Sequence, residues 1–312
     1  MTAPADTAGL ARVGIIMPTY NGARFIGEQL DSLLGQVGVS LHVYAFDDGS
    51  SDRTVAILRD YAAAHPDMFS VFENEVNSGG TGLNIFCNIH RVSDNHDFFA
   101  LADQDDVWLP DKLLRGIEAL RRDGTDLYFS NLMVWDGKDA ILGLVRRDAP
   151  LRVRDHLFGG GSAGCTYVLS ARFFLHLKDR LAPIDFNGIK RISHDWTIYF
   201  IARHDDFGVS VASDAMIKYR VHSDSQYGAM TLGGAGALLR KFRMLRGGFL
   251  MEQVVNALRF ARPGTEDERA LLAYRRSWLG RLSVLLRHNR SLARETSRFV
   301  FLVIATLIFV RK

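Results

Sequence analysis

Residues 98–108 read FFALADQDDVW, a short apolar run that ends in a cluster of aspartates. Short apolar runs bounded by polar clusters are typical of buried β-strands. Two earlier runs have the same form, because residues 13–17 (VGIIM) are followed by PTYNG and residues 41–46 (LHVYAF) are followed by DDGSSD. The sequence therefore predicts several buried strands that each end in polar side chains.

Helix-like runs separate these strands along the chain. Apolar residues recur at helical spacing within residues 25–34, 54–64, 83–92 and 110–122, and further strand-like runs cover residues 69–72 and 127–130. This alternation predicts an α/β fold with a mostly parallel central sheet and helices on both faces. Ligands of such sheets bind beyond the carboxyl ends of the strands. The polar clusters are therefore expected to form one site.

The chain is predicted to have three parts. Residues 1–12 are expected to be a flexible N-terminus, residues 13–235 an α/β catalytic domain and residues 236–312 a helical C-terminal extension that follows a linker at 232–236. In the extension, Thr265-x-x-Glu268 forms a capping-box pattern that predicts a helix start. Within the second half of the domain we expect short mixed strands at 166–169, 209–212 and 216–221 and helices at 171–180 and 195–203.

Composition and charge limit the classes of function. The 312 residues are 47% apolar and 23% charged, which is ordinary for a globular protein. Cys87 and Cys165 form no close pair, so neither a disulfide framework nor a zinc site is predicted, which favours a reducing, cytoplasmic compartment. Residues 1–12 lack the basic start and apolar run of a signal peptide. Residues 236–312 hold 16 Lys and Arg against 5 Asp and Glu, a net charge of +11, whereas the rest of the chain has a net charge of −8.

Asp103, Asp105 and Asp106 are the leading candidates for a metal site. Carboxylates this close in the chain repel one another unless a cation neutralises them. Mg²⁺ and Mn²⁺ prefer carboxylate oxygens, and Mg²⁺ often bridges to substrate phosphates. The alternative is a solvated acidic turn in which Asp106 caps the next helix. The position at the end of an apolar strand favours the metal site.

Two other polar pairs have both a structural and a functional interpretation. Asp47 and Asp48 follow a strand, and they either accept hydrogen bonds from a base or ribose or hold a tight turn before the next helix. Both interpretations are compatible if one aspartate serves the ligand. His194 and Asp195 either begin a helix or supply a general base toward a hydroxyl group.

Arg220 and His222 follow the strand-like residues 216–219. Cationic or metal-binding groups at this position would stabilise the charge that develops on a leaving diphosphate. The alternative is that both residues are packed or lie at the surface.

A glycine-rich segment resembles a dinucleotide-binding fingerprint but lacks its context. Gly159, Gly161 and Gly164 match G-x-G-x-x-G, yet a strand-like run follows them where the fingerprint needs a helix. The sequence has no G-x-x-x-x-G-K-[ST] motif, which excludes a P-loop. We expect a flexible loop in this segment instead.

The basic C-terminal part has two interpretations. Arg287, Arg290, Arg294 and Arg298 recur at steps of three and four, which predicts one basic helix face, and residues 299–310 (FVFLVIATLIFV) are uncharged. A membrane-spanning helix needs about 20 apolar residues, so a transmembrane segment is not expected. A basic face beside an apolar end indicates an interfacial helix on an anionic membrane surface, and the alternative is a terminal helix packed on the core. No nucleic-acid-binding module is recognisable, so no nucleic acid is expected as a partner.

The motifs together resemble the family 2 glycosyltransferases, which have the GT-A fold. The resemblance covers about residues 13–228 and is ordered, with PTYNGARFIGEQLDSLLGQ, FDDGSSDRT, NSGGTGLN, FALADQDDVWLPDK, HDW and YRVHSDSQYG in turn. The variants DQDDVW, HDW and YRVH, with Gln226 and Gly228 nearby, are most similar to the rhamnosyltransferase-like branch, which builds bacterial surface polysaccharides.

The resemblance implies roles for individual residues. Asp195 would be the catalytic base, and Asp105 and His222 would hold Mg²⁺ or Mn²⁺ beside the diphosphate. The family often has an acidic residue where this chain has His194, which leaves the role of His194 open. The acceptor side would include Gly164, Cys165, His194 and Trp196. The nucleotide-sugar donor would be held by Pro18, Thr19, Tyr20, Asn21, Asp47, Asp48, Asn77, Gly80, Asp103, Gln104 and Arg220.

The resemblance also implies the reaction. A sugar would pass with inversion from a nucleotide donor, dTDP-rhamnose or alternatively a UDP-hexose, to a hydroxyl of a saccharide or lipid-linked acceptor. The enzyme would be cytoplasmic, with a peripheral position on the inner face of the cell membrane. A non-catalytic carbohydrate-binding or scaffold protein is the alternative from another class, but it would not need the acidic cluster together with Asp195. A nucleotidyltransferase is disfavoured because PTYNG stands where a Gly-rich basic loop is expected.

Overall fold

The structure is a computed structural model that describes residues 9–222 and 243–308. The described strands are β1 (Ala11–Thr19), β2 (Val39–Asp47), β3 (Phe69–Glu73), β4 (Phe98–Leu101), β5 (Val107–Trp108), β6 (Leu127–Trp135), β7 (Ile141–Val145), β8 (Val168–Ser170) and β9 (Val209–Arg220). The α-helices are α1 (Ile26–Leu34), α2 (Thr54–Ala64), α3 (Thr81–Asn88), α4 (Lys112–Asp123), α5 (Ala171–Leu181), α6 (His194–His204), α9 (Phe249–Phe260), α10 (Glu266–Arg276), α11 (Trp278–His288) and α12 (Thr296–Ile308). Short 3₁₀ segments are η1 (Ile89–Arg91), η2 (Asp155–Leu157), η3 (Gly164–Thr166) and η4 (Asn289–Leu292).

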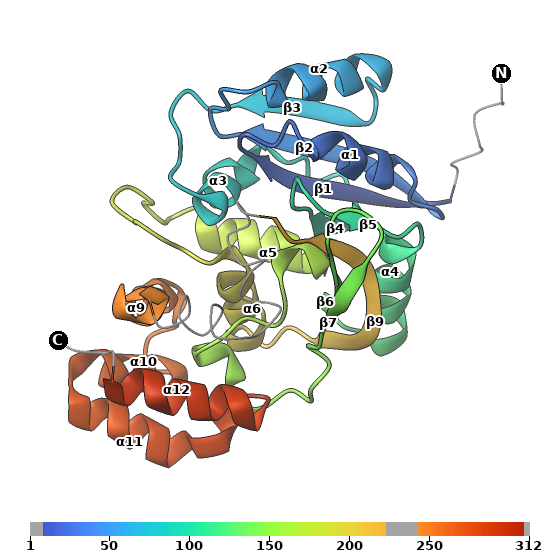
Figure 1. The fold of residues 1–312 in the computed structure, drawn as a ribbon. Helices are drawn as coiled ribbons and strands as arrows, with labels where there is room; N and C mark the ends of the chain where they lie inside the picture. The colour runs from blue at the N-terminus through green and yellow to red at the C-terminus, as the bar shows by residue number, and fades with distance from the viewer. Residues whose placement is uncertain (1–8, 223–242, 309–312) are drawn as a thin grey trace.

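The described strands form one sheet in the order β3-β2-β1-β4-β8-β6-β9-β5, and β7 pairs with β6 (Figure 1). β1 is parallel to both of its neighbours, with Val13 opposite Leu41 of β2 and Phe98 of β4. β8 is antiparallel to β4 and to β6, while β6 and β9 are parallel. The predicted mostly parallel α/β sheet is therefore confirmed, with antiparallel pairs in its second half.

Consecutive residues of β1 belong to cores on opposite faces of the sheet. Val13, Ile15 and Met17 pack with α1, α2 and α4, whereas Ile16 packs with α3, α5 and α6. A parallel strand covered on both faces needs apolar residues at successive positions. This explains why the sequence of β1 shows a continuous apolar run and no alternation.

Most predicted elements are present within a few residues of their expected bounds. The two predicted strands at 209–212 and 216–221 are one strand, β9, whose register with β6 shifts near Asn131. β5 and β7 were not predicted, because β5 has only two residues and β7 lies at the edge with mostly exposed side chains. Cys87 and Cys165 are both free, as predicted.

The C-terminal helices pack on the core that α3, α5 and α6 share. Val254, Tyr274 and Leu302 belong to one continuous apolar cluster with Phe200 of α6. Figure 1 shows α10, α11 and α12 as a layer beside α6 and α9. At the predicted capping box the Thr265 side chain accepts a hydrogen bond from the N–H of Glu268 at 3.2 Å, which confirms the helix start. The predicted boundary at 235/236, the linker at 232–236, Gln226 and Gly228 lie outside the described residues.

Two predictions about the basic C-terminal part have different outcomes. The single basic helix face is wrong, because α11 ends before Asn289, whose φ is 42°, so that Arg287 and Arg298 lie on different helices. Arg294 lies between those helices, is buried and donates a hydrogen bond to the carbonyl of Gly161. Across residues 9–222 and 243–308, no helix has the length and apolar character needed to cross a membrane.

Candidate active site

The carboxyl ends of β1, β2 and β4 bring the polar clusters to one edge of the sheet (Figure 1). At the end of β1, Pro18 precedes Thr19, whose hydroxyl donates a hydrogen bond to Asp47 Oδ1 at 3.0 Å. Asp47 also accepts from the N–H of Ser50 at 2.8 Å and from its hydroxyl at 2.6 Å. Asp47 thereby ties the ends of β1 and β2 to the turn that leads into α2.

Asp48 anchors the loop between β3 and α3. Its Oδ1 accepts from the N–H of Ser78 and its Oδ2 from the Ser78 hydroxyl, both at 2.8 Å, while Asn77 donates its amide to the Asp48 carbonyl at 2.6 Å. Gly80 has a φ of 151° at the start of α3, a conformation that favours glycine. Asp47 and Asp48 are both buried and both hold the rim of the site. Direct contact of either carboxylate with a base or ribose stays a prediction.

Tyr20 is an exposed aromatic residue on this rim, with 51% of its surface accessible. Gln104 accepts from the N–H of Tyr20 and donates to its carbonyl, both at 2.9 Å. A Cβ on Gly22 would lie 2.3 Å from Gln104 Oε1, so a larger residue at position 22 would displace the Gln104 side chain from Tyr20. Asn21 has a φ of 47°, and its N–H donates to Ser50 Oγ at 2.8 Å. Gln104 therefore joins the predicted nucleotide-binding residues at the end of β1 to the acidic turn, which is formed by residues 103–106.

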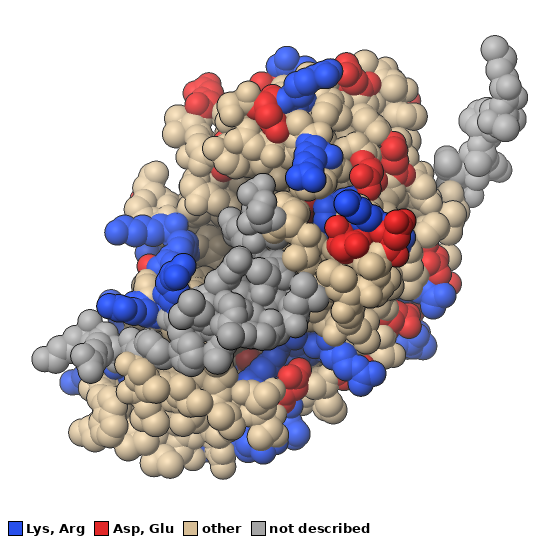
Figure 2. All heavy atoms as spheres, viewed as in Figure 1, with Lys and Arg blue, Asp and Glu red and all other residues tan. Residues whose placement is uncertain are grey.

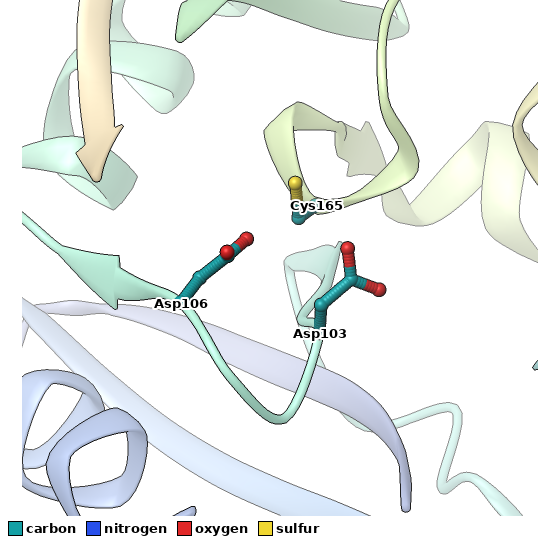
Figure 3. A group of neighbouring side chains, drawn as sticks. All are labelled: Asp103, Asp106 and Cys165. Atoms are coloured by element: carbon teal, nitrogen blue, oxygen red, sulfur yellow. The ribbon is translucent and has the colours of Figure 1, made fainter. Parts of the chain in front are cut away.

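The acidic turn after β4 is folded against the protein. Figure 3 shows the carboxylates of Asp103 and Asp106 converging with Cys165, and one ligand atom from each of the three lies within 4.8 Å of the others. Asp106 is fully buried; its Oδ1 accepts from the N–H of Arg220 at 3.1 Å, and its Oδ2 has no partner among the described residues. The residue before α4 is Asp111. The alternative of a solvated turn with Asp106 as a helix cap is therefore wrong.

Burial and mutual repulsion raise the pKa values of the acids in this turn. Burial and then the charge of Asp105 raise the pKa of Asp103 to about 7. Burial and the charges of Asp105 and Asp103 raise the pKa of Asp106 well above its ordinary value, and burial raises that of the Cys165 thiol. The charge of Asp195 also contributes to the raised pKa of Asp103, so the predicted base lies near the turn. A divalent cation would relieve this repulsion.

Asp105 and His222, the predicted metal ligands, are in contact, with Asp105 Oδ2 2.8 Å from His222 Nε2. Arg220 is buried beside them. Its Nε donates to the carbonyl of Asp105 and its Nη2 to Glu28 Oε2, both at 2.8 Å. These contacts fix the backbone of the acidic turn, and a direct contact of Arg220 with a diphosphate stays a prediction.

The donor set of the turn suits a hard divalent cation. The carboxylates of Asp103 and Asp105 and the imidazole of His222 are ligands that Mg²⁺ or Mn²⁺ accepts, and the unpartnered Oδ2 of Asp106 leaves a further buried acceptor. Cys165 is the least suitable ligand of the group because a soft thiol is a poor partner for these ions. The group of Asp103, Asp105 and His222 therefore fits such a metal better than the group of Asp103, Asp106 and Cys165 does.

Asp195 lies in the first turn of α6, so the predicted helix start is confirmed. Its Oδ1 accepts from the N–H of Trp196 at 2.8 Å and from the hydroxyl of Ser193. Tyr167 donates its hydroxyl hydrogen to the Asp195 carbonyl at 3.0 Å. The N–H groups at a helix N-terminus also stabilise negative charge. Asp195 is a positioned carboxylate, and its role as the base stays a prediction.

Three of the four residues predicted on the acceptor side, Gly164, Cys165 and Trp196, are buried. The Trp196 indole N–H donates to a backbone carbonyl at 2.8 Å. The segment around η3 packs beneath the acidic turn, and contact of these residues with the acceptor stays a prediction. Gly164 lies against His194, where a Cβ would be 2.3 Å from His194 Nε2. Burial lowers the pKa of His194.

Three residues near the site were not found from the sequence. Glu28 in α1 pairs with Arg220, Lys112 in α4 places its amino group 3.6 Å from the centre of the Trp108 ring, and Tyr219 in β9 is close to the acids. Burial lowers the pKa of Lys112 to about 7 and raises that of Tyr219. Each residue comes from a different element, so no local pattern marked them.

Comparisons with known sequences agree with this geometry. A protein-family model described as Glycosyl transferase family 2 matches residues 14–179. The chain is 29% identical over 217 residues to the dTDP-rhamnosyl transferase RfbG of Shigella flexneri. The aligned region covers 68% of this chain and 74% of that protein. It is 26% identical over 246 residues to an uncharacterized glycosyltransferase of Rickettsia typhi, covering 76% of this chain and 71% of that protein.

Solved structures share the fold at low sequence identity. TarS of S. aureus in complex with UDP-GlcNAc has a TM-score of 0.57 and 17% identity, covering 96% of this chain and 82% of that chain. The mannosyltransferase PcManGT from Pyrobaculum calidifontis in complex with GDP-Man and Mn²⁺ has a TM-score of 0.57 and 16% identity. The match covers 98% of this chain and 78% of that chain. The fold is thus GT-A with C-terminal helices added. Because the family model spans more than half of the chain, the protein belongs to glycosyl transferase family 2 and is a glycosyltransferase.

Proposed function

We propose that this enzyme is an inverting, metal-dependent glycosyltransferase that moves L-rhamnose from dTDP-rhamnose to an acceptor hydroxyl in cell-surface polysaccharide synthesis. The observation that carries the proposal is the position of Asp195 at the start of α6. The preceding residue, His194, packs against Gly164, which adjoins the Cys165 that converges with Asp103 and Asp106. A displacement at a sugar carbon needs a base on one side and a stabilised leaving group on the other. Asp195 and the acidic turn supply groups of these two kinds within one site.

The reaction follows from this arrangement. Asp195 takes the proton of the acceptor hydroxyl while that oxygen attacks the anomeric carbon, and the bond from this carbon to the nucleotide diphosphate breaks on the opposite face, so the configuration inverts. Ser193 and the N–H of Trp196 hold the carboxylate in place. Mg²⁺ or Mn²⁺, held by Asp105 and His222 with Asp103 nearby, would neutralise charge on the diphosphate.

The donor is proposed from the relatives. The curated relative RfbG of Shigella flexneri is named a dTDP-rhamnosyl transferase, which supports dTDP-rhamnose. TarS was solved with UDP-GlcNAc, which supports a UDP-hexose as the second candidate. A thermal-shift panel of dTDP-rhamnose, UDP-GlcNAc and UDP-glucose, each with and without Mn²⁺, tests the choice. We expect the largest stabilisation from dTDP-rhamnose with metal, and a larger shift from a UDP-sugar would replace the donor.

The metal is tested by one substitution and its control. Asp105→Ala removes a predicted ligand and is expected to abolish the metal-dependent part of the thermal shift together with transfer. Asp60→Ala changes an exposed aspartate of α2 and should leave both unchanged. If Asp105→Ala keeps metal-dependent donor binding at the wild-type level, Asp105 is not a ligand.

A peripheral position on the inner membrane surface is proposed from the C-terminal helices. Figure 2 shows that the visible surface of these helices is largely uncharged. Their exposed large apolar residues are Leu272, Trp278, Leu279, Leu286, Val300, Ile304, Leu307 and Ile308. Such side chains gain free energy by entering an interface.

Sedimentation with anionic phospholipid vesicles tests this position. The wild type should sediment with the vesicles, and the double substitution Leu279→Ser and Leu286→Ser should reduce the bound fraction, because these side chains are 72% and 71% exposed. Val76→Ser, at a side chain that is 80% exposed on the GT-A part, is the matched control. Equal binding by both variants would contradict a membrane role for the helices.

A further inference from the structure

The segment that leads into α6 has no regular structure of its own. Residues 189–193 belong to no helix or strand, and α6 begins at His194. Ile192 of this segment is buried in the apolar core. Buried backbone groups outside helices and strands need hydrogen-bond partners from other parts of the protein. The partners of this segment therefore decide how firmly the start of α6 is held.

Two buried amide side chains of α9, which lies beside α6 (Figure 1), supply these partners. The N–H of Ser193 donates to Gln253 Oε1 at 2.9 Å. The carbonyl of Arg191 accepts from Asn256 Nδ2 at 2.8 Å and from Gln253 Nε2 at 3.4 Å. Positions three apart lie on one face of a helix, so both amides face this segment. α9 thus bonds to the backbone on both sides of Ile192.

The two amides differ from the rest of the buried face of α9. The other buried side chains of this helix are apolar, namely Leu250, Val254, Ala257 and Phe260. Burying an amide costs free energy unless its hydrogen bonds are made, and an apolar side chain would fill the same space without that cost. What Gln253 and Asn256 add to the packing is therefore their hydrogen bonds to residues 191–193.

An ion pair extends the same contact toward the surface. Arg191 Nε lies 2.7 Å from Glu252 Oε2, and Arg191 Nη2 lies 3.0 Å from Glu252 Oε1. The Arg191 side chain is 44% exposed and that of Glu252 is 33% exposed. Exposed ion pairs contribute little to stability because water screens them. The buried amides are therefore the main link between α9 and the segment.

Ser193 connects this link to the proposed base. Its N–H is held by Gln253, and its hydroxyl donates to Asp195 Oδ1. A shift of the Ser193 backbone therefore moves a direct partner of the Asp195 carboxylate. A displacement of about 1 Å of a reacting group can lower the rate roughly 100-fold.

We propose that Gln253 and Asn256 are positioning residues for the proposed base, so that the C-terminal helices take part in the reaction by holding residues 191–193. This inference rests on the proposed function, because it takes Asp195 as the base. Neither amide touches the reacting atoms. Both act through the backbone that precedes α6, so their loss affects turnover and leaves the metal and the donor bound as before.

Hydrogen exchange of the full chain, followed by mass spectrometry, tests the contact without a substrate. Gln253→Met keeps the length of the side chain but removes the acceptor for the Ser193 N–H. We expect peptides that cover residues 191–196 to exchange about tenfold faster than in the wild type, while peptides of β1 and β2 keep their rates. Unchanged exchange of residues 191–196 would overturn the proposal.

Gln36→Met is the matched control for this measurement. Gln36 is also a buried amide, and it accepts from the N–H of Leu113 at 3.1 Å and donates to the carbonyl of Leu109 at 2.8 Å. It lies between α1 and β2, at the end of β2 away from the site. Gln36→Met should leave the exchange of residues 191–196 and the kcat unchanged. Equal exchange of these residues in the two variants would count against a specific role of Gln253.

Turnover is measured as release of dTDP from dTDP-rhamnose with Mn²⁺ and water as the acceptor, or of UDP from the UDP-sugar if that donor gives the larger thermal shift. Gln253→Met and Asn256→Leu should each lower kcat by roughly 10- to 100-fold with an unchanged KM for the donor. Gln253→Glu keeps an oxygen that accepts from the Ser193 N–H and should retain more of the kcat than Gln253→Met. A wild-type kcat in both Gln253→Met and Asn256→Leu would refute the positioning role.

A double substitution shows whether Gln253 acts through the base. In Asp195→Asn the side chain no longer accepts a proton, so the residual turnover does not depend on its exact position. Adding Gln253→Met to Asp195→Asn should therefore lower this residual turnover by less than about twofold. The same fold-loss from Gln253→Met in both backgrounds would mean that Gln253 does not act through Asp195.

The two kinds of measurement separate failure of this inference from failure of the proposed function. Normal turnover of Asp195→Asn, or no release of a nucleoside diphosphate from any nucleotide sugar, would contradict the proposed function, and hydrogen exchange would still decide whether α9 holds residues 191–193. Loss of turnover in Asp195→Asn, with wild-type exchange and kcat in Gln253→Met, would overturn the positioning role alone.

Discussion

The aspartates of the site differ in what surrounds them, and this determines what each can do. Asp106 is buried under the turn, and burial raises its pKa well above the ordinary value. Asp105 keeps its carboxylate next to His222. Asp195 lies apart from them at the start of a helix, with a hydroxyl and an N–H bound to one oxygen. The same side-chain chemistry thus occurs as a buried acid, a proposed metal ligand and a proposed base.

Asp195→Asn tests the base directly. The amide has almost the same shape as the carboxylate but does not accept a proton, so we expect transfer to fall by roughly 100- to 10,000-fold. Donor affinity in the presence of metal should stay at the wild-type value. Asp185→Asn changes an exposed acid in the preceding loop and should leave turnover unchanged. Near-normal turnover of Asp195→Asn would remove Asp195 as the base.

Arg220→Lys tests how the acidic turn is held. Arg220 donates from separate nitrogens to the carbonyls of Asp105 and Gly137 and to Glu28, and one ammonium group does not reproduce this geometry. We expect a loss of roughly 3 kcal/mol in the free energy of unfolding, measured in urea, and a higher KM for the donor. Arg53→Lys, at an exposed position, serves as the control. Unfolding curves that superimpose for the two variants would show that Arg220 does not stabilise the turn.

Among the helices and strands, α3 packs directly against the segment that leads into α6. That segment precedes the proposed base, Asp195. A Cβ on Gly82 of α3 would lie 2.1 Å from the carbonyl oxygen of Ile192 and 3.3 Å from the N–H nitrogen of His194. Both atoms belong to the backbone that leads into Asp195. The first turn of α3, beside the nucleotide rim, is therefore in direct contact with the segment that carries the base.

Gly82→Ala should displace this segment. Because the contact is with backbone, the chain has to shift, and we expect a loss of about 1–3 kcal/mol in stability and a lower kcat. Gly143→Ala in β7 adds the same methyl group where nothing lies within 4 Å and is the matched control. Thermal unfolding and steady-state kinetics of the two variants are compared. A Gly82→Ala protein with the kcat of Gly143→Ala would show that the base does not depend on this packing.

For the whole molecule, the C-terminal helices are attached to the GT-A part through a buried charge. Asp267 of α10 is bonded to Arg154, to His156 Nε2 at 2.8 Å and to His204 Nδ1 at 2.9 Å, and these partners come from η2, the residue before it and the end of α6. Burial alone would raise the pKa of Asp267, but the hydrogen bonds from the two histidines and the charge of Arg154 lower it well below its ordinary range. The extension is thus part of one folded unit with the site.

Asp267→Asn should therefore weaken the whole fold in a pH-dependent way. A carboxyl whose folded pKa is depressed contributes stability that is present above its unfolded pKa of about 3.9 and is lost as pH falls through that value toward the folded pKa. We expect a loss of about 3 kcal/mol at pH 7 and a flatter decline of stability below about pH 4 than in the wild type. The free energy of unfolding in urea, measured from pH 7 to pH 3, is the readout.

The control for this prediction is Asp139→Asn, at an exposed aspartate that follows β6. It should keep both the stability at pH 7 and the steep decline in acid. If Asp267→Asn declines in acid as steeply as the control, another carboxyl is responsible for the acid sensitivity.

The sequence by itself determined the first half of the sheet and the identity of most polar residues at its edge. Continuous apolar runs predicted β1, β2 and β4 because parallel strands covered on both faces need apolar side chains at every position. The clusters after those strands were expected to meet because their carboxyl ends share one edge. The helix start at Asp195 and the capping box at Thr265 are also local signals, since each depends on side chains within one turn.

Only the tertiary structure decided which of those residues are buried and which of them contact one another. Cys165 and Trp196 lie in the core, Arg220 holds the acidic turn and Arg294 is covered between α11 and α12, although their sequence contexts gave no sign of burial. The contacts of Asp267 with His156 and His204 join segments that are far apart in the chain. Burial and long-range charge contacts depend on which segments pack together, and the spacing of residues along a chain does not contain that information.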